Sequence, residues 1–333
     1  MQTSHRLTHW LLTLFALVMA ASVSLAADPG ISYPLTSEAS DQKAGSVLFY
    51  NLYASKSTNT KSEDTDISIT NTNRSESVVV HIFFVDGSTC SLSADIGVCL
   101  TPWQTTSFLV SDVDPDETGY IVAVAVKSSG YPVSFNYLIG SEYVKLASDH
   151  AASLNAEAFA ALYTDALPES GAGFGMATLN FDGIVYNRAP RVLAFDNIRS
   201  VVDGNSALLI VNRVGGALPS GTTLGLLFGV LHNDVDFGYT FLALPSGCQL
   251  RSELSDSFPR VIGLFSNAIP SGHTGWMEFW ATADVGILGA VINFNNKKAN
   301  KGQAAFSGGR NLHKLTLTTD SLTIPLFETR PAC

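Results

Sequence analysis

Short runs of apolar or alternating residues, each bounded by polar turns, recur along most of the chain. Residues 78–85 read V-V-V-H-I-F-F-V, an apolar run that predicts a central strand buried on both faces. Residues 66–70 alternate polar and apolar positions, as expected for a strand with one buried face. Similar runs predict further strands at 47–53, 105–110, 224–231, 239–244 and 261–265. The pattern indicates an all-β protein.

Residues 118–136 have a diverged counterpart at 274–295, and each copy predicts a strand, a glycine-containing turn and a second strand that ends on Phe-Asn. Shorter blocks recur in the same order, with 47–51 matching 192–196 and 69–71 matching 210–212. We therefore predict a tandem repeat. The alternative is chance similarity, since unrelated β-proteins share alternating apolar residues and glycine turns.

An alanine-rich segment separates the two copies. Residues 153–167 place Leu154, Ala158 and Leu162 at a spacing of four and end at Pro168, which predicts a short helix. The run E-S-G-A-G-F-G that follows is typical of a linker. The predicted fold is all-β, with two related immunoglobulin-like β-sandwich domains joined by a short helical linker.

The first residues have the features of a secretory signal peptide. Arg6 precedes an apolar run, and Ser24-Leu25-Ala26 is a small-x-small cleavage signature, so 1–26 is predicted to be removed. An uncleaved membrane anchor is the alternative. The predicted divisions are listed in order: signal peptide 1–26, flexible leader 27–44, first domain 45–146, helical and glycine-rich linker 147–176, second domain 177–333. The leader's alternative role is an arm that adds a strand to a neighbouring molecule.

Composition limits the classes of partner. The chain has 19 Lys plus Arg against 29 Asp plus Glu, a net charge of -10, which argues against binding to nucleic acid. No second long apolar run follows the signal peptide, so we expect no membrane association after processing. Four cysteines fit an oxidising compartment, and we expect a secreted protein, extracellular or periplasmic.

The cysteines are predicted to form two disulfides. Cys90 and Cys99 flank a short segment read as a turn, so we predict that they are bonded to each other. Cys248 and Cys333 then remain, and we predict a bond between them. The alternative is that the terminal thiol of Cys333 reaches another molecule, so self-association stays open.

The chain lacks the motifs of common catalytic centres, including G-x-S-x-G, H-E-x-x-H and a Walker loop. One acidic run, Asp112-Val113-Asp114-Pro115-Asp116-Glu117, places alternate carboxylates in a loop, a pattern that can bind Ca²⁺. A solvated turn is the alternative, because the spacing of a dedicated calcium loop is missing. No other cofactor is predicted.

Trp276, Glu278 and Trp280 share one face of a predicted strand, while Phe279 takes the other face. Two indoles beside a carboxylate can form a carbohydrate-binding surface. The alternative is that this face belongs to the core.

Four segments carry a resemblance to a known group: V-L-F-Y-N-L-Y at 47–53, V-H-I-F-F-V-D-G-S-T-C at 80–90, T-G-Y-I-V-A-V-A-V at 118–126 and Y-N-R-A-P-R-V-L-A-F-D-N-I at 186–198. They resemble an uncharacterised group of secreted bacterial tandem β-sandwich proteins. The resemblance implies a bacterial origin and an envelope or extracellular location, and it implies no activity.

These patterns predict a non-enzymatic binding or structural module of the cell envelope or extracellular space, with carbohydrate or protein at the cell surface as its partner. A polysaccharide-acting hydrolase is one alternative. A subunit of a surface fibre or layer is the other.

Overall fold

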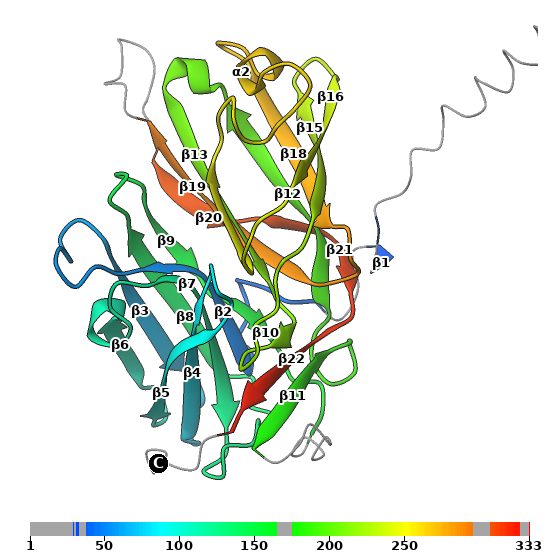
Figure 1. Ribbon diagram of the computed structural model, residues 1–333. Helices are drawn as coiled ribbons and strands as arrows, with labels where there is room; N and C mark the ends of the chain where they lie inside the picture. The colour runs from blue at the N-terminus through cyan, green and yellow to red at the C-terminus, as the bar shows by residue number, and fades with distance from the viewer. Residues whose placement is uncertain (1–28, 30, 33–37, 165–174, 296–306, 327–332) are drawn as a thin grey trace, which may run out of the picture.

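The computed structural model describes residues 29, 31–32, 38–164, 175–295, 307–326 and 333. In this part of the chain β-strands predominate, and helix is limited to α2 (Phe265–Ala268) and two 3-10 turns. The strands form five sheets, which are antiparallel apart from one parallel pair. Figure 1 shows most strands of the second half above those of the first half, while β11 and β22 of the second half lie at the lower right, level with β4 and β5.

The first half of the chain contributes two sheets. The five-stranded sheet contains, in spatial order, β10 (Glu157–Phe159), β2 (Val47–Ala54), β7 (Thr118–Val126), β4 (Val78–Asp86) and β5 (Leu92–Leu100). The first four-stranded sheet contains β6 (Thr105–Leu109), β3 (Asp64–Asn71), β8 (Leu138–Lys145) and β9 (Ala151–Asn155). Apart from the hairpin pairs β4–β5 and β8–β9, successive strands from β2 to β10 alternate between these sheets, so most connections cross from one sheet to the other.

The second half contributes three further sheets, in which only the edge strand β1 comes from the first half. The six-stranded sheet contains β1 (Ile31–Ser32), β21 (His313–Thr318), β12 (Ala189–Arg199), β18 (Thr274–Ala281), β15 (Leu227–Asn233) and β16 (Gly238–Ala243). The second four-stranded sheet contains β17 (Gln249–Glu253), β13 (Asn205–Arg213), β19 (Ile287–Asn295) and β20 (Gly308–Asn311). The three-stranded sheet contains β11 (Met176–Phe181), β22 (Asp320–Pro325) and β14 (Gly216–Ala217).

Strand β4 shows why the apolar runs become central strands. Its β-branched and aromatic residues are buried on both faces, as the sequence predicts. Ile82 and Phe84 pack into a core shared with the first four-stranded sheet, while Phe83 and Val85 pack toward the three-stranded sheet. A strand covered on both sides needs a continuous apolar sequence rather than an alternating one.

Two of the apolar cores join residues from both halves of the chain. In one core Phe49 and Val122 of the five-stranded sheet pack with Phe181 and Leu322 of the three-stranded sheet. In the other, residues of β2, β8 and β9 pack with residues of β13 and β19. The two halves therefore bury apolar surface against each other in both cores.

Buried amides reinforce this junction. The side-chain nitrogen of Asn212 donates to the carbonyl oxygen of Asn51 at 2.8 Å, and that of Gln249 donates to Asn212 Oδ1 at 2.8 Å and to the Gly119 carbonyl at 3.0 Å. Asn51 in turn donates to Asn311 Oδ1 at 2.9 Å. These hydrogen bonds link β2 and β7 to β13, β17 and β20, so separating the halves would leave several amides without partners.

The predicted helical linker is wrong. Residues 151–155 and 157–159 form strands β9 and β10. The last residues of the predicted helix, 165–167, and most of the glycine-rich run after it lie outside the described residues. Ala152, Leu154, Ala156 and Ala158 are all buried, a period of two that fits a strand. Pairing with β8 and β2 overrides the helical preference of alanine, because those strands are present only in the tertiary structure.

The predicted tandem repeat of a two-stranded hairpin is also wrong. The segment 118–136 holds one strand, β7, and the chain after it forms an isolated bridge and turns. Its counterpart at 274–295 holds β18 and β19, but these strands belong to different sheets and do not pair. The similar sequences therefore do not mark two copies of one hairpin.

The expectation of two immunoglobulin-like sandwiches joined by a helical linker is wrong, because the linker forms strands and the described strands form five small sheets. The chain forms five small sheets, as many as the blades of a five-bladed β-propeller. Each sheet takes its strands from separated stretches of the chain, whereas a propeller repeats a four-stranded blade.

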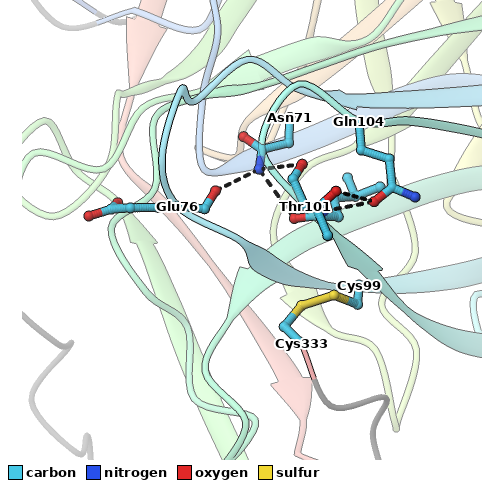
Figure 2. Close-up of a disulfide and its surroundings, with 7 residues drawn as sticks. Asn71, Glu76, Cys99, Thr101, Gln104 and Cys333 are labelled. Atoms are coloured by element: carbon cyan, nitrogen blue, oxygen red, sulfur yellow. Dashed lines mark hydrogen bonds between the residues drawn. A yellow bond between two sulfur atoms is a disulfide. The ribbon is translucent and has the colours of Figure 1, made fainter.

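The disulfide pairing predicted from spacing is wrong. Cys99 is bonded to Cys333 (Figure 2). Cys90 and Cys248 are free thiols. Cys90 lies in the turn after β4, and Cys99 lies near the far end of the continuous strand β5. Nine residues of extended chain span roughly 30 Å, so Cys90 and Cys99 cannot meet. The segment read as a turn is instead a strand, and Cys333 reaches its outer edge.

The described parts of the predicted leader are paired. Ile31–Ser32 forms β1 at the edge of the six-stranded sheet, against Thr316 and Leu317 of β21. Ser40 forms an isolated bridge with Ala158. The predicted signal peptide lies outside the described residues. None of the helices in the described part of the chain is long and apolar enough to span a bilayer.

Candidate functional site

Strand β18 presents the predicted aromatic residues on the outer face of the six-stranded sheet. Trp276 is 38 % exposed and Glu278 and Trp280 are partly exposed, while Met277 and Phe279 are buried in the core behind them. The alternation predicted from the sequence is therefore present, and the alternative in which Trp276, Glu278 and Trp280 form the core is wrong. Met277 and Phe279 fill the core instead.

The neighbouring strand β15 adds two more rings to this face. His232 of β15 lies opposite Trp276 in register, and their rings stack with centroids 4.5 Å apart at an interplanar angle of 10°. Phe228 lies opposite Trp280, with centroids 5.0 Å apart. Cross-strand pairing brings these rings together, because directly opposed side chains in an antiparallel sheet project to the same side. We call these five residues, His232, Phe228, Trp276, Glu278 and Trp280, the aromatic face.

A single carboxylate lies near the middle of the aromatic face. Glu278 Oε1 is 4.0 Å from His232 Nε2, and burial lowers the pKa of that imidazole. Within the described residues the Nε2 atom has no hydrogen-bond partner. A histidine with a lowered pKa is neutral near pH 7, so the face combines apolar rings with a neutral imidazole and a carboxyl group.

An exposed apolar side chain extends the aromatic face toward the sheet edge. Leu242 of β16 is 57 % exposed and lies opposite Phe228 in register. Phe237, in the turn between β15 and β16, is 60 % exposed, but its ring lies 5.1 Å from that of Tyr239, which packs against the core on the other side of the sheet, so Phe237 is not part of this surface. Exposed apolar side chains that lie together mark an interaction site more often than scattered single residues do, and Leu242 adds to the rings of Phe228 and Trp280 in this way.

A polar cavity of about 740 Å³ opens between β9, β20 and β21, on the far side of β12 from the aromatic face. Its lining includes Asp41, Asn155 and Asn311, together with Arg310 and His313. His313 pairs with Ala194 in register, and Ala194 pairs with Glu278, so His313 and Glu278 lie in one row across the sheet. His313 and the aromatic face therefore lie on the same side of the sheet, with strand β12 between them.

The acidic run does not converge on one point. Asp114 is buried and accepts hydrogen bonds from the hydroxyls of Tyr53 and Ser93, both at 2.7 Å. Asp116 is exposed and accepts from the backbone and hydroxyl of Ser57. The carboxylates of Asp114 and Asp116 therefore accept hydrogen bonds from different protein groups and do not point to a common site.

The remaining two carboxylates of the run also differ in environment. Asp112 is exposed in the 3-10 turn η1 (Val110–Asp112), while burial and the nearby Asp86 raise the pKa of Glu117. Among the described residues no group of three or more His, Cys, Asp or Glu side chains is placed to hold a metal ion. Calcium binding by Asp112, Asp114, Asp116 and Glu117 stays a prediction, which a melting curve in millimolar Ca²⁺ against chelator would test.

Sequence reasoning missed His232 and Phe228. The segments 224–231 and 239–244 were predicted as strands around a polar turn, and β15 and β16 do pair with each other. The pairing of β15 with β18, which brings His232 and Phe228 beside the indoles, joins segments about 50 residues apart. No local pattern specifies that register.

Comparisons with known proteins identify no family. No protein-family model matches the chain, and no curated protein matches it either. Among solved structures, a β-glucuronidase from glycoside hydrolase family 2 aligns with a TM-score of 0.15 and 6% identity, over 86% of this chain. The chain spans about a quarter of that enzyme, since the alignment covers 25% of its length.

Proposed function

We propose that this chain is a non-enzymatic carbohydrate-binding module of the cell envelope or extracellular space, and that the aromatic face holds the glycan. The observation that carries the proposal is the outward arrangement of Trp276 and Trp280 on either side of Glu278. The axial C–H groups of a pyranose ring pack on an indole, and a carboxylate accepts hydrogen bonds from sugar hydroxyls. Both kinds of contact are available on one sheet.

The charge of the chain narrows the class of glycan. The net charge is -10, and Glu278 lies within the binding surface. Acidic polysaccharides would be repelled, so neutral glycans and amino sugars are the expected ligands. Stacking on exposed indoles with few polar contacts supports dissociation constants on the order of micromolar to millimolar.

A binding role fits the surroundings of Glu278 better than hydrolysis does. Glycosidases use two carboxyl groups about 5 to 10 Å apart. In register, the neighbours of Glu278 on the adjacent strands are Ala194 and Val230, neither of which carries an acid. The Cys99–Cys333 disulfide supports a location outside the cytoplasm, where such bonds persist.

The test is a titration of the purified chain with soluble neutral glucans, chito-oligosaccharides and, for contrast, alginate, followed by calorimetry. Trp276→Ala should weaken binding of the neutral ligand about tenfold or more, because an anchoring Trp contributes more than about 1.4 kcal/mol. Trp103→Ala is the matched control, since Trp103 is 61 % exposed in the other half of the chain.

Three results would count against the proposal. One is an absence of binding to any glycan in the panel, and another is an equal loss of affinity in the Trp276 and Trp103 variants. The third is release of reducing ends from a polysaccharide at a rate abolished by Glu278→Gln, which would replace the binding role with hydrolysis.

A further inference from the structure

Two cysteines that are not part of the Cys99–Cys333 disulfide lie together between the halves of the chain. Cys90 is 4 % exposed in the turn that follows β4, and Cys248 is 1 % exposed immediately before β17. Both belong to the apolar core that joins the five-stranded and three-stranded sheets. Their separation in sequence hides a close approach in space.

The backbone holds the two loops against each other. The amide of Cys248 donates to the carbonyl oxygen of Gly87 at 3.1 Å. The carbonyl oxygen of Asp86 lies 3.5 Å from Cys248 Sγ and accepts from the amide of Cys90 at 2.8 Å. The two thiols are also close enough for each to affect the pKa of the other.

The close packing of the loops leaves no room between them. A Cβ atom added at Gly247 would lie 2.1 Å from the Gly87 carbonyl oxygen, so glycine is required next to Cys248. The turn before Cys90 is fixed by Asp86, whose carboxylate accepts from the Ser88 amide at 2.7 Å and the Thr89 hydroxyl at 2.6 Å. The approach of the two cysteines is therefore built into the fold.

Cys90 also adopts an unusual backbone conformation. Its φ is 64°, in the left-handed region that residues other than Gly, Asn and Asp rarely occupy. Such a conformation persists where the surrounding structure imposes it, and it is a reason to look for a role of the side chain. Here it directs the side chain into the core that contains Cys248.

We infer that Cys90 and Cys248 form a second disulfide when the chain folds in an oxidising compartment. This bond would join the five-stranded sheet of the first half to the second four-stranded sheet. The oxidant is a small-molecule disulfide such as glutathione disulfide. One cysteine thiolate attacks it and releases one glutathione thiolate, and the other cysteine then displaces the second glutathione. Two protein thiols and one glutathione disulfide thus become one protein disulfide and two glutathione thiols.

The environment of the thiols determines when the bond can form. Burial raises the pKa of both cysteines, Cys248 the more strongly, so the folded chain holds little thiolate. Thiolate is the attacking species, and oxidation of the already folded protein should therefore be slow. We expect the bond to form during folding and afterwards to resist reduction without denaturant.

The experiment uses the unaltered full chain. It is unfolded with reductant, refolded in a mixture of reduced and oxidised glutathione, and alkylated in denaturant without reduction. Mass spectrometry should find no alkylated cysteine and a mass about 4 Da below that of the reduced chain. Peptide mapping should find Cys90 linked to Cys248 and Cys99 linked to Cys333.

Single substitutions provide the controls. In Cys90→Ser, alkylation should modify Cys248 alone, and in Cys248→Ser it should modify Cys90 alone. Two free thiols at Cys90 and Cys248 in the refolded wild-type chain would overturn the inference. A link from either residue to Cys99, Cys333 or a second molecule would overturn it as well.

Discussion

Replacing Lys314 by methionine would leave the carboxylate of Glu157 without its cation inside the protein. Lys314 Nζ lies 2.7 Å from Glu157 Oε2, and the two side chains are 11% and 1% exposed. The pair joins β21 of the six-stranded sheet to β10 of the five-stranded sheet. Among the described residues the second oxygen, Oε1, has no hydrogen-bond partner, so Lys314 is the main group that compensates this charge.

The size of the effect follows from two limits. Charges 2.7 Å apart attract by about 6 kcal/mol at an effective dielectric constant of about 20. An isolated Glu157 would escape that loss by taking up a proton, which at pH 7 costs about 3.7 kcal/mol for a group with an unfolded pKa of about 4.3. Burial already raises the pKa of Glu157 although Lys314 lowers it. We therefore expect Lys314→Met to reduce the free energy of unfolding by about 3 kcal/mol.

The pH dependence distinguishes a lost charge pair from lost packing. Without Lys314 the folded-state pKa of Glu157 rises further above its unfolded value. Stability that depends on the protonated acid is fully present below pH 4.3 and is lost as pH rises. Urea unfolding followed by circular dichroism should show a deficit of about 3 kcal/mol at pH 7 and under about 1 kcal/mol at pH 4.5.

Two variants serve as controls. Lys43→Met removes the ion pair between Lys43 and Glu38, in which the Lys43 side chain is 67% exposed. This change should alter the free energy of unfolding by less than about 0.5 kcal/mol. Glu157→Gln combined with Lys314→Met should recover much of the loss at pH 7. A deficit in Lys314→Met that matches Lys43→Met, or one that is equal at both pH values, would refute the reasoning.

Two further changes test the buried acid of the first half and the disulfide. Burial raises the pKa of Glu142 well above its usual value, so the stability of the wild-type chain should fall as pH rises above about 4.3. In Glu142→Gln the urea midpoint should change less between pH 4.5 and 8 than in the wild-type chain. The same pH dependence of the midpoint in both proteins would contradict this. Cys99→Ser removes a disulfide between residues 234 positions apart, which frees the unfolded chain, so thermal unfolding should show that the free energy of unfolding falls by up to about 5 kcal/mol. An unchanged melting temperature would contradict this account.

Features that depend on neighbouring residues could be predicted from the sequence. The alternation of β18 places Trp276, Glu278 and Trp280 on one side because successive side chains point to opposite faces. The apolar run of β4 predicts a strand covered on both faces, and two cores cover it. Both statements hold whatever strand lies alongside.

Features that depend on distant partners could not be predicted. Ala156 and Ala158 fit a helix by propensity and a strand by burial, and pairing with β2 and β8 decides between them. Spacing along the chain brought Cys90 and Cys99 together only on the assumption of a turn, whereas β5 extends between them. Sequence distance is a poor guide where consecutive strands alternate between sheets.

The junction between the halves affects how the aromatic face would act. β18 is backed by the buried Met277 and Phe279, and the second four-stranded sheet behind that core is linked by buried amides to β2 and β7. A face held in this way is already ordered before a ligand arrives, so little conformational entropy is lost on binding. Even weak stacking of a ligand on Trp276 can then give measurable affinity, because none of its free energy is used to order flexible loops. This reasoning favours a rigid platform for a repeating polymer over a site that closes around a small molecule.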